Sequence, residues 1–228
     1  MITLHHLEHS RSQRILWLLE ELELDYRIQR YARNPDTQLA PASLKTIHPL
    51  GKSPVLTDTT SGESMTLAES GTIIEYLART YGSGQWAPST EHADYWAYHY
   101  WMQYAEASLM PPLLIKLIFD KLRTEPPFFI RPVTGAIAAQ VDRAFTNQQI
   151  NTHFEYVDQH LKANEWLLGA TISAADIQIS FPLEAAVARG TAAESLTHIH
   201  AYVERFQSRP AYQRALEAGG DYAYGPQS

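Results

Sequence analysis

A proline at the entrance to a short apolar run constrains the fold of this chain more than any other feature. In the segment 51–56, Gly-Lys-Ser-Pro-Val-Leu, Pro54 cannot donate a hydrogen bond to a sheet, so it belongs at a strand entrance, an edge or a tight bend. A strand-like run over 65–67 then passes into an amphipathic helix over 70–81. The start of that helix, Glu69-Ser70, places a carboxylate and a hydroxyl beside free backbone N–H groups, which favours anion binding.

Size, charge and the absence of cysteine exclude several classes of protein. The 228 residues can bury a large core, and no apolar run approaches the ~20 residues of a membrane helix, so no membrane is expected as a partner. A net charge of −7 without clustered Lys and Arg argues against nucleic acid. The N-terminus lacks the layout of a secretory signal, so we expect a cytoplasmic protein. With no cysteine, any thiol chemistry requires a thiol supplied by a ligand.

The pattern of apolar residues divides the chain into two parts. Residues 2–7 and 26–31 alternate as strands around a helix, and two further strands and the helix 70–81 complete a βαβ–ββα unit. Gly82, Gly84 and Pro88 mark a linker over 83–90. The rest reads as helix. We therefore expect an α/β domain over 1–82 and an all-α domain over 91–228.

Three segments of the second part stand out. The helix 91–110 carries aromatic residues all round, which implies burial on more than one side. Ser173 to Asp176 reads as a capped helix start. The tail from Gly219 has no periodicity, and is expected to be mobile or folded over the site.

Together, in this order, the proline corner, Glu69-Ser70 and Ser173–Asp176 resemble the cytosolic glutathione S-transferase family, serine-type and theta-like, in a bacterial or fungal-like form. The resemblance covers essentially the whole chain. It implies a thioredoxin-like N-terminal domain that binds glutathione and a helical domain that lines the electrophile pocket. Glutathione would be a co-substrate, and no other cofactor is implied.

The resemblance assigns the catalytic role to Ser10. A free thiol titrates near ~8.5, so the protein must lower that value to obtain a thiolate. Serine-type members use a hydroxyl at the end of the first strand, which donates to the sulfur; here that position is Ser10, with Arg14 in the place of the helix-opening arginine. Two alternatives stay open: Ser10 and Gln13 form a capping box only, or Ser12 contacts the thiol. Tyr98 and Tyr104 are more distant candidates.

Five further residues are implied to hold glutathione. Lys52 would reach the glycyl carboxylate, the backbone of Ser53 and a cis-Pro54 would pair with the cysteinyl part, and Glu69 and Ser70 would hold the γ-glutamyl end. Ser53 departs from the Val, Ile or Leu common in the family. Without a ligand, an alternative reading takes Glu69 as the first-turn acid and Ser70 as the cap of a helix; the family pattern favours the binding role.

The wall of the electrophile pocket is assigned to the aromatic helix. Tyr98, Trp101, Met102 and Ala105 are its candidates, although the same residues can be a packing stripe. A metal site is not expected, because His5 and His6 point to opposite faces of a strand.

The predicted function is transfer of the glutathione thiolate to small apolar electrophiles. Reduction of organic hydroperoxides by glutathione is an alternative, as is a non-catalytic binding module of the same fold. A homodimer is expected, because the helix 91–110 has too much apolar surface for a monomer.

Overall fold

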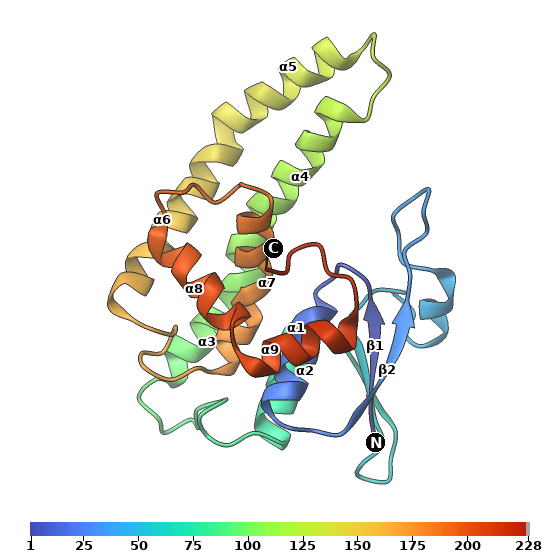
Figure 1. Cartoon of the computed structure of the whole chain (residues 1–228), viewed down its shortest axis with the longest axis vertical. Coiled ribbons are helices and arrows are strands. Elements are labelled where there is room, and N and C mark those ends of the chain that lie inside the picture. Colours follow the sequence, from blue (N-terminus) through green and yellow to red (C-terminus); the bar gives the residue numbers. More distant parts are fainter. Residues whose placement is uncertain (227–228) are drawn as a thin grey trace.

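Four strands form one mixed sheet in the order β2–β1–β3–β4 in the computed structural model, which describes residues 1–226 (Figure 1). They are β1 (Ile2–Leu7), β2 (Tyr26–Tyr31), β3 (Val55–Asp58) and β4 (Met65–Ala68). β1 runs parallel to β2 and antiparallel to β3, with Leu4 opposite Leu56. β1 is therefore a central strand, and its end lies between the loops that follow β1 and precede β3.

Two helices and a short 3₁₀ turn complete this domain. Helix α1 (Ser12–Glu21) connects β1 to β2, and α2 (Ser70–Thr80) follows β4; the 3₁₀ turn η1 spans Ala42–Thr46. The apolar residues of α1 and α2 are buried where these helices pack against β1, β3 and one another. The prediction of a thioredoxin-like N-terminal domain is confirmed.

The remainder is helical, as predicted. It comprises α3 (Tyr95–Tyr104), α4 (Met110–Thr124), α5 (Arg131–Val141), α6 (Asn147–Ala163), α7 (Ala174–Ala188), α8 (Thr197–Gln207) and α9 (Pro210–Gly219). Wide π-turns, η2 (Ala105–Leu109) and η3 (Asp142–Thr146), join α3 to α4 and α5 to α6. The two resulting long helices extend beyond the rest of the molecule as a hairpin (Figure 1).

Helix α7 lies at the centre of the helical domain, and residues 174–186 of it are all buried. Its start has the predicted cap. The carboxylate of Asp176 accepts the N–H groups of Ser173 and Leu167, both at 2.8 Å, and the hydroxyl of Tyr202 at 2.7 Å. An apolar helix can therefore begin inside the protein without unsatisfied N–H groups.

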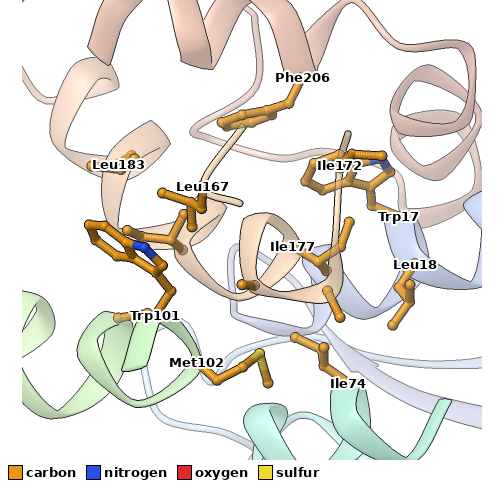
Figure 2. Close-up of a cluster of buried hydrophobic side chains, with 14 of the residues drawn as sticks. Trp17, Leu18, Ile74, Trp101, Met102, Leu167, Ile172, Ile177, Leu183 and Phe206 are labelled. Carbon is orange, nitrogen blue, oxygen red and sulfur yellow. The ribbon is translucent and has the colours of Figure 1, made fainter. Parts of the chain in front are cut away.

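A single hydrophobic core joins the sheet domain to the helical domain. Figure 2 shows Trp17 and Leu18 of α1 and Ile74 of α2 facing Ile177 of α7, with Met102 of α3 beside them. Because interiors are close-packed, this shared core fixes how α1 and α2 lie against the helical domain.

The chain returns to the sheet domain at its C-terminus. After α9, residues 220–226 pack against α7 and the loop that follows β1; the last two residues of the predicted tail lie outside the described part. Within residues 1–226 no helix has both the length and the apolar character needed to cross a bilayer.

Candidate active site

Two loops meet at the end of β1 through the backbone of Leu7. The hydroxyl of Ser10 donates to the carbonyl oxygen of Leu7 at 2.8 Å. The hydroxyl of Ser53 accepts from the N–H of Leu7 at 3.3 Å and donates to the carbonyl oxygen of His5 at 3.1 Å. Ser53 precedes Pro54 in a cis peptide bond, as expected. The structure therefore brings Ser10 and the proline corner to the same strand end.

The departure of Ser53 from the usual aliphatic residue has a structural explanation. An aliphatic side chain cannot make the two hydrogen bonds by which Ser53 holds the proline corner against β1. Both bonds use the Ser53 side chain, so the backbone N–H and C=O of Ser53 are not needed to attach the loop. The loop is thus fixed by a side chain while the backbone of Ser53 stays available to a ligand.

Ser10 is buried and lies two residues before α1, and the capping box that was its alternative role does not form. The Ser10 hydroxyl accepts the N–H of Ser12 at 3.2 Å. The amide of Gln13 points elsewhere and donates to the carbonyl oxygen of Ala215 in α9 at 3.0 Å. Gln13 thus secures α9 against α1, and Ser10 alone serves the helix start.

Arg14 connects α1 to the predicted γ-glutamyl site. Its fully buried guanidinium donates to the hydroxyl of Ser70, the carbonyl oxygen of Gln178 and the carboxylate of Glu106. A guanidinium can only donate, so Ser70 accepts here and its own proton is free for a ligand. The preceding residue, Glu69, is exposed and has a φ of +68°. A non-glycine residue in that region is strained, and such strain concentrates at functional sites.

Glu106 was missed in the sequence. It lies in the first π-turn, where its carboxylate accepts from Arg11 Nε at 2.9 Å and from Arg14. Burial alone would raise the pKa of Glu106, but the two guanidinium groups outweigh it and hold the pKa below its usual range. One signal could have revealed it: Glu106 is the only acidic or basic residue, histidine aside, between 95 and 115. A lone charge in an aromatic stretch needs a partner.

A cleft of about 750 Å³ opens between the two domains beside Ser10. His9 and Arg11, the neighbours of Ser10, both line it. The opposite wall comes from α4 and α7, with the loop after β2 and the C-terminal tail at its edges; apolar members include Met110, Leu113, Leu117, Phe181 and Tyr224. The lining combines these apolar side chains with charged ones, among them Arg33, Lys116 and Arg189, and a cleft of this size suits a small ligand.

The four residues predicted as the electrophile wall do not line this cleft. Tyr98, Trp101, Met102 and Ala105 are at most 5% exposed and belong to the core shared by the two domains. The hydroxyl of Tyr98 donates to Glu75 of α2. The physical reason is that α7 packs against α3 and covers this side of it. The cleft is instead lined by α4, further along the same long helix.

The remaining predicted residue, Lys52, is exposed at the rim of the proline loop. Among residues 1–226 no three His, Asp or Glu side chains gather into a group that could hold a metal ion.

Comparison with known proteins agrees with this arrangement. Residues 10–80 match the model of the glutathione S-transferase N-terminal domain, and residues 133–218 match that of the C-terminal domain. Glutathione S-transferase 3 of Schizosaccharomyces pombe is 36% identical over 95% of this chain and 87% of its own length. The chain belongs to the glutathione S-transferase family. Glutathione S-transferase 1 of Saccharomyces cerevisiae is 35% identical over 95% of this chain and 94% of its own.

A crystal structure of a glutathione S-transferase from Actinobacillus pleuropneumoniae has the same fold. It is 30% identical and superimposes with a TM-score of 0.78, covering 99% of this chain and 100% of that one. The N-terminal family match starts at Ser10 and includes the proline corner and Glu69-Ser70. Ser10, the proline corner and Glu69-Ser70 thus lie within the part of the chain that identifies the family.

Proposed function

We propose that this glutathione S-transferase conjugates the thiolate of glutathione to small apolar electrophiles, with Ser10 as the catalytic residue. One observation carries the proposal: Leu7 and Arg14 bring Ser10, the Ser53–Pro54 corner and Ser70 to one strand end beside a cleft with an apolar wall from α4 and α7. The backbone at Ser53 and Pro54 would bind the cysteinyl part. Lys52 would pair with the glycyl carboxylate, and Glu69 and Ser70 would hold the γ-glutamyl end.

The chemistry requires only a stabilised thiolate and a positioned electrophile. The Ser10 hydroxyl would donate to the sulfur and lower its pKa, and the N–H groups at the start of α1 would add to this. The thiolate then attacks the electrophilic carbon; an S–C bond forms as the leaving group departs with its electron pair. No covalent enzyme intermediate is needed.

The decisive experiment is retention on immobilised glutathione followed by two activity assays. We expect retention and conjugation of 1-chloro-2,4-dinitrobenzene. Turnover by Ser10→Ala should be at least tenfold slower, because loss of one preorganised hydrogen-bond donor to a negative charge slows turnover roughly 10²–10³-fold. Turnover of cumene hydroperoxide alone would favour the peroxidase alternative. Retention without turnover of either compound would mean a binding module.

We also propose that the protein is a homodimer. Trp96 on α3 is 78% exposed, and Tyr100 and Tyr156 beside it are each 46% exposed, which leaves an aromatic face toward solvent. Large exposed apolar patches mark interfaces. Light scattering at micromolar concentration should give about twice the 25.8 kDa of one chain, and a monomer mass would contradict the proposal.

A further inference from the structure

A chain of hydrogen bonds leads from Ser10 into the interior of the sheet domain. Ser10 Oγ lies 2.9 Å from Ser12 Oγ, which in turn lies 2.9 Å from Nδ1 of His6. The exposed fractions of the three side chains are 7%, 0% and 3%. The function proposed above gives no role to His6, and Ser12 appears only as the alternative to Ser10.

The two serine hydroxyls share one acceptor. The carbonyl oxygen of Leu7 is 2.8 Å from Ser10 Oγ and 3.2 Å from Ser12 Oγ. To donate to a sulfur atom, Ser10 must turn its proton away from Leu7. Ser12 can then supply the hydrogen bond to Leu7, but only if its own single proton is not already donated to His6.

The position of the proton on the His6 ring therefore decides which atoms donate and which accept along this chain of hydrogen bonds. Burial is the largest of the effects that together lower the pKa of His6 to about 4; Arg30 on β2 and His9 act in the same direction, and Glu8 opposes them. The ring is thus neutral at pH 7 and carries one N–H. Within the described residues 1–226, Nδ1 of the His6 ring has a hydrogen-bond partner and Nε2 has none. A proton on Nδ1 therefore has an acceptor, Ser12 Oγ.

We propose that His6 is a positioning residue whose Nδ1–H donates to Ser12 and thereby leaves the Ser10 hydroxyl free to donate to the sulfur of glutathione. The inference rests on the proposed role of Ser10. With Nδ1–H as donor, the Ser12 hydroxyl keeps donating to the carbonyl oxygen of Leu7 when the Ser10 hydroxyl turns to the ligand. His6 remains neutral throughout, touches no substrate, and forms and breaks no covalent bond.

Nitrogen NMR of the full-length protein with glutathione bound tests the tautomer directly. The ¹⁵N shifts of the His6 ring at pH 7 should show a protonated Nδ1 and an unprotonated Nε2. Ser12→Ala should move the Nδ1 signal, which assigns the donor. A ring protonated only on Nε2, or on both nitrogens, overturns the proposal.

Titration of bound glutathione, followed by thiolate absorbance, tests the consequence. Ser12→Ala should raise the thiol pKa by about one unit, the shift equivalent to losing one buried hydrogen bond. His6→Leu removes the donor that directs the Ser12 proton to Leu7, so the Ser12 hydroxyl can turn to either Leu7 or Ser10 and the thiol pKa should rise by less than about one unit. His6→Asn is the matched control, since its Nδ2–H occupies the place of Nδ1–H and should keep the wild-type titration. Because the residues form one chain, the double variant His6→Leu/Ser12→Ala should shift the pKa no further than Ser12→Ala.

Ser10→Ala separates the two proposals. If its thiol pKa equals that of the wild type, the assignment of Ser10 in the proposed function fails. If Ser10→Ala raises the pKa while Ser12→Ala and His6→Leu titrate as wild type, the role of His6 fails and that of Ser10 stands. Should His6→Leu not fold, Ser12→Ala, His6→Asn and the NMR measurement still give these outcomes.

Discussion

The hydroxyl of Tyr212 donates to Oε2 of Glu184 at 2.7 Å, deep inside the helical domain. Tyr222 of the C-terminal tail donates to the other oxygen of the same carboxylate. Glu184 is buried in α7, so one carboxylate holds both α9 and the tail against the central helix. The contact gives the tail a fixed position at the edge of the cleft.

Glu184 should make stability depend on pH. Burial raises its pKa to about 7 from 4.5, although the hydrogen bonds of Tyr222 and Tyr212 oppose the rise. Between these values the folded protein holds a proton that the unfolded chain has lost, so the free energy of unfolding falls as pH increases and is level above about 7. The contribution of this group is roughly 3 kcal/mol.

Glu184→Gln isolates this effect, because His6 acts in the opposite sense. The lowered pKa of His6 means that stability is lost as pH falls from 6.5 towards 4. Urea unfolding of wild type and Glu184→Gln at several pH values should show the wild type losing ~3 kcal/mol relative to the variant between pH 4.5 and 7.5. Parallel curves would contradict the raised pKa.

Tyr222→Phe should loosen the tail. Above about pH 7, where Glu184 is ionised, the change removes its hydrogen bond to Tyr222 and should cost about 1.5–3 kcal/mol of local stability, the range for a bond to a charged group. Ala223 and Tyr224 border the cleft, so the KM for the electrophile should rise while glutathione affinity stays constant. Hydrogen exchange of residues 220–226 measures the loosening. Tyr212→Phe, which removes the other hydrogen bond to Glu184 and leaves that of the tail, is the control.

Glu106→Gln should weaken the γ-glutamyl site through Arg14. The variant keeps the shape but leaves a buried guanidinium without its carboxylate. The cost should be about 1–3 kcal/mol, below that of a fully buried pair, because the Glu106 side chain is 31% exposed. Glutathione affinity should fall as Ser70 loses its orientation. Arg11→Gln removes the more exposed partner and should cost under ~1 kcal/mol, so equal losses in both variants would refute the special role of Arg14.

Glu69 offers a test in which stability and binding move apart. Glu69→Gly and Glu69→Ala both remove the carboxylate, so both should weaken glutathione binding by roughly 2–3 kcal/mol. Only glycine adopts a φ of +68° without strain, so the ligand-free glycine variant should be more stable than the alanine variant by about 1–2 kcal/mol. Equal melting temperatures would mean that the backbone there is relaxed.

Local sequence patterns were sufficient to predict the elements and the order of the domains. Strand alternation in 2–7 and 26–31, the proline before β3 and the cap at Ser173 each depend on neighbouring residues, and each appears in the structure. The assignment of Ser10, Glu69 and Ser70 came from a family resemblance, and their catalytic and binding roles stay predictions.

Side-chain direction could not be predicted where distant segments decide it. Gln13 fits a capping box, yet the carbonyl of Ala215, 202 residues away, takes its amide. Tyr98 and Trp101 fit a pocket wall, but α7 covers that side of α3. The role of Glu106 depends on its contact with Arg14, and that of Glu184 on its contact with Tyr222. No periodicity in the sequence connects the members of either pair.

The bonds of Arg14 also bear on how far the two halves of this enzyme are interchangeable. A single guanidinium on α1 is held by Gln178 and Glu106 of the helical half and by Ser70 of the sheet half. A chimaera that joins residues 1–82 to the helical half of a relative would carry Arg14 into a new setting. Such a chimaera should fold when the helical half of the relative supplies a carboxylate at the place of Glu106. The residue at position 106 therefore indicates which sheet and helical domains can be combined.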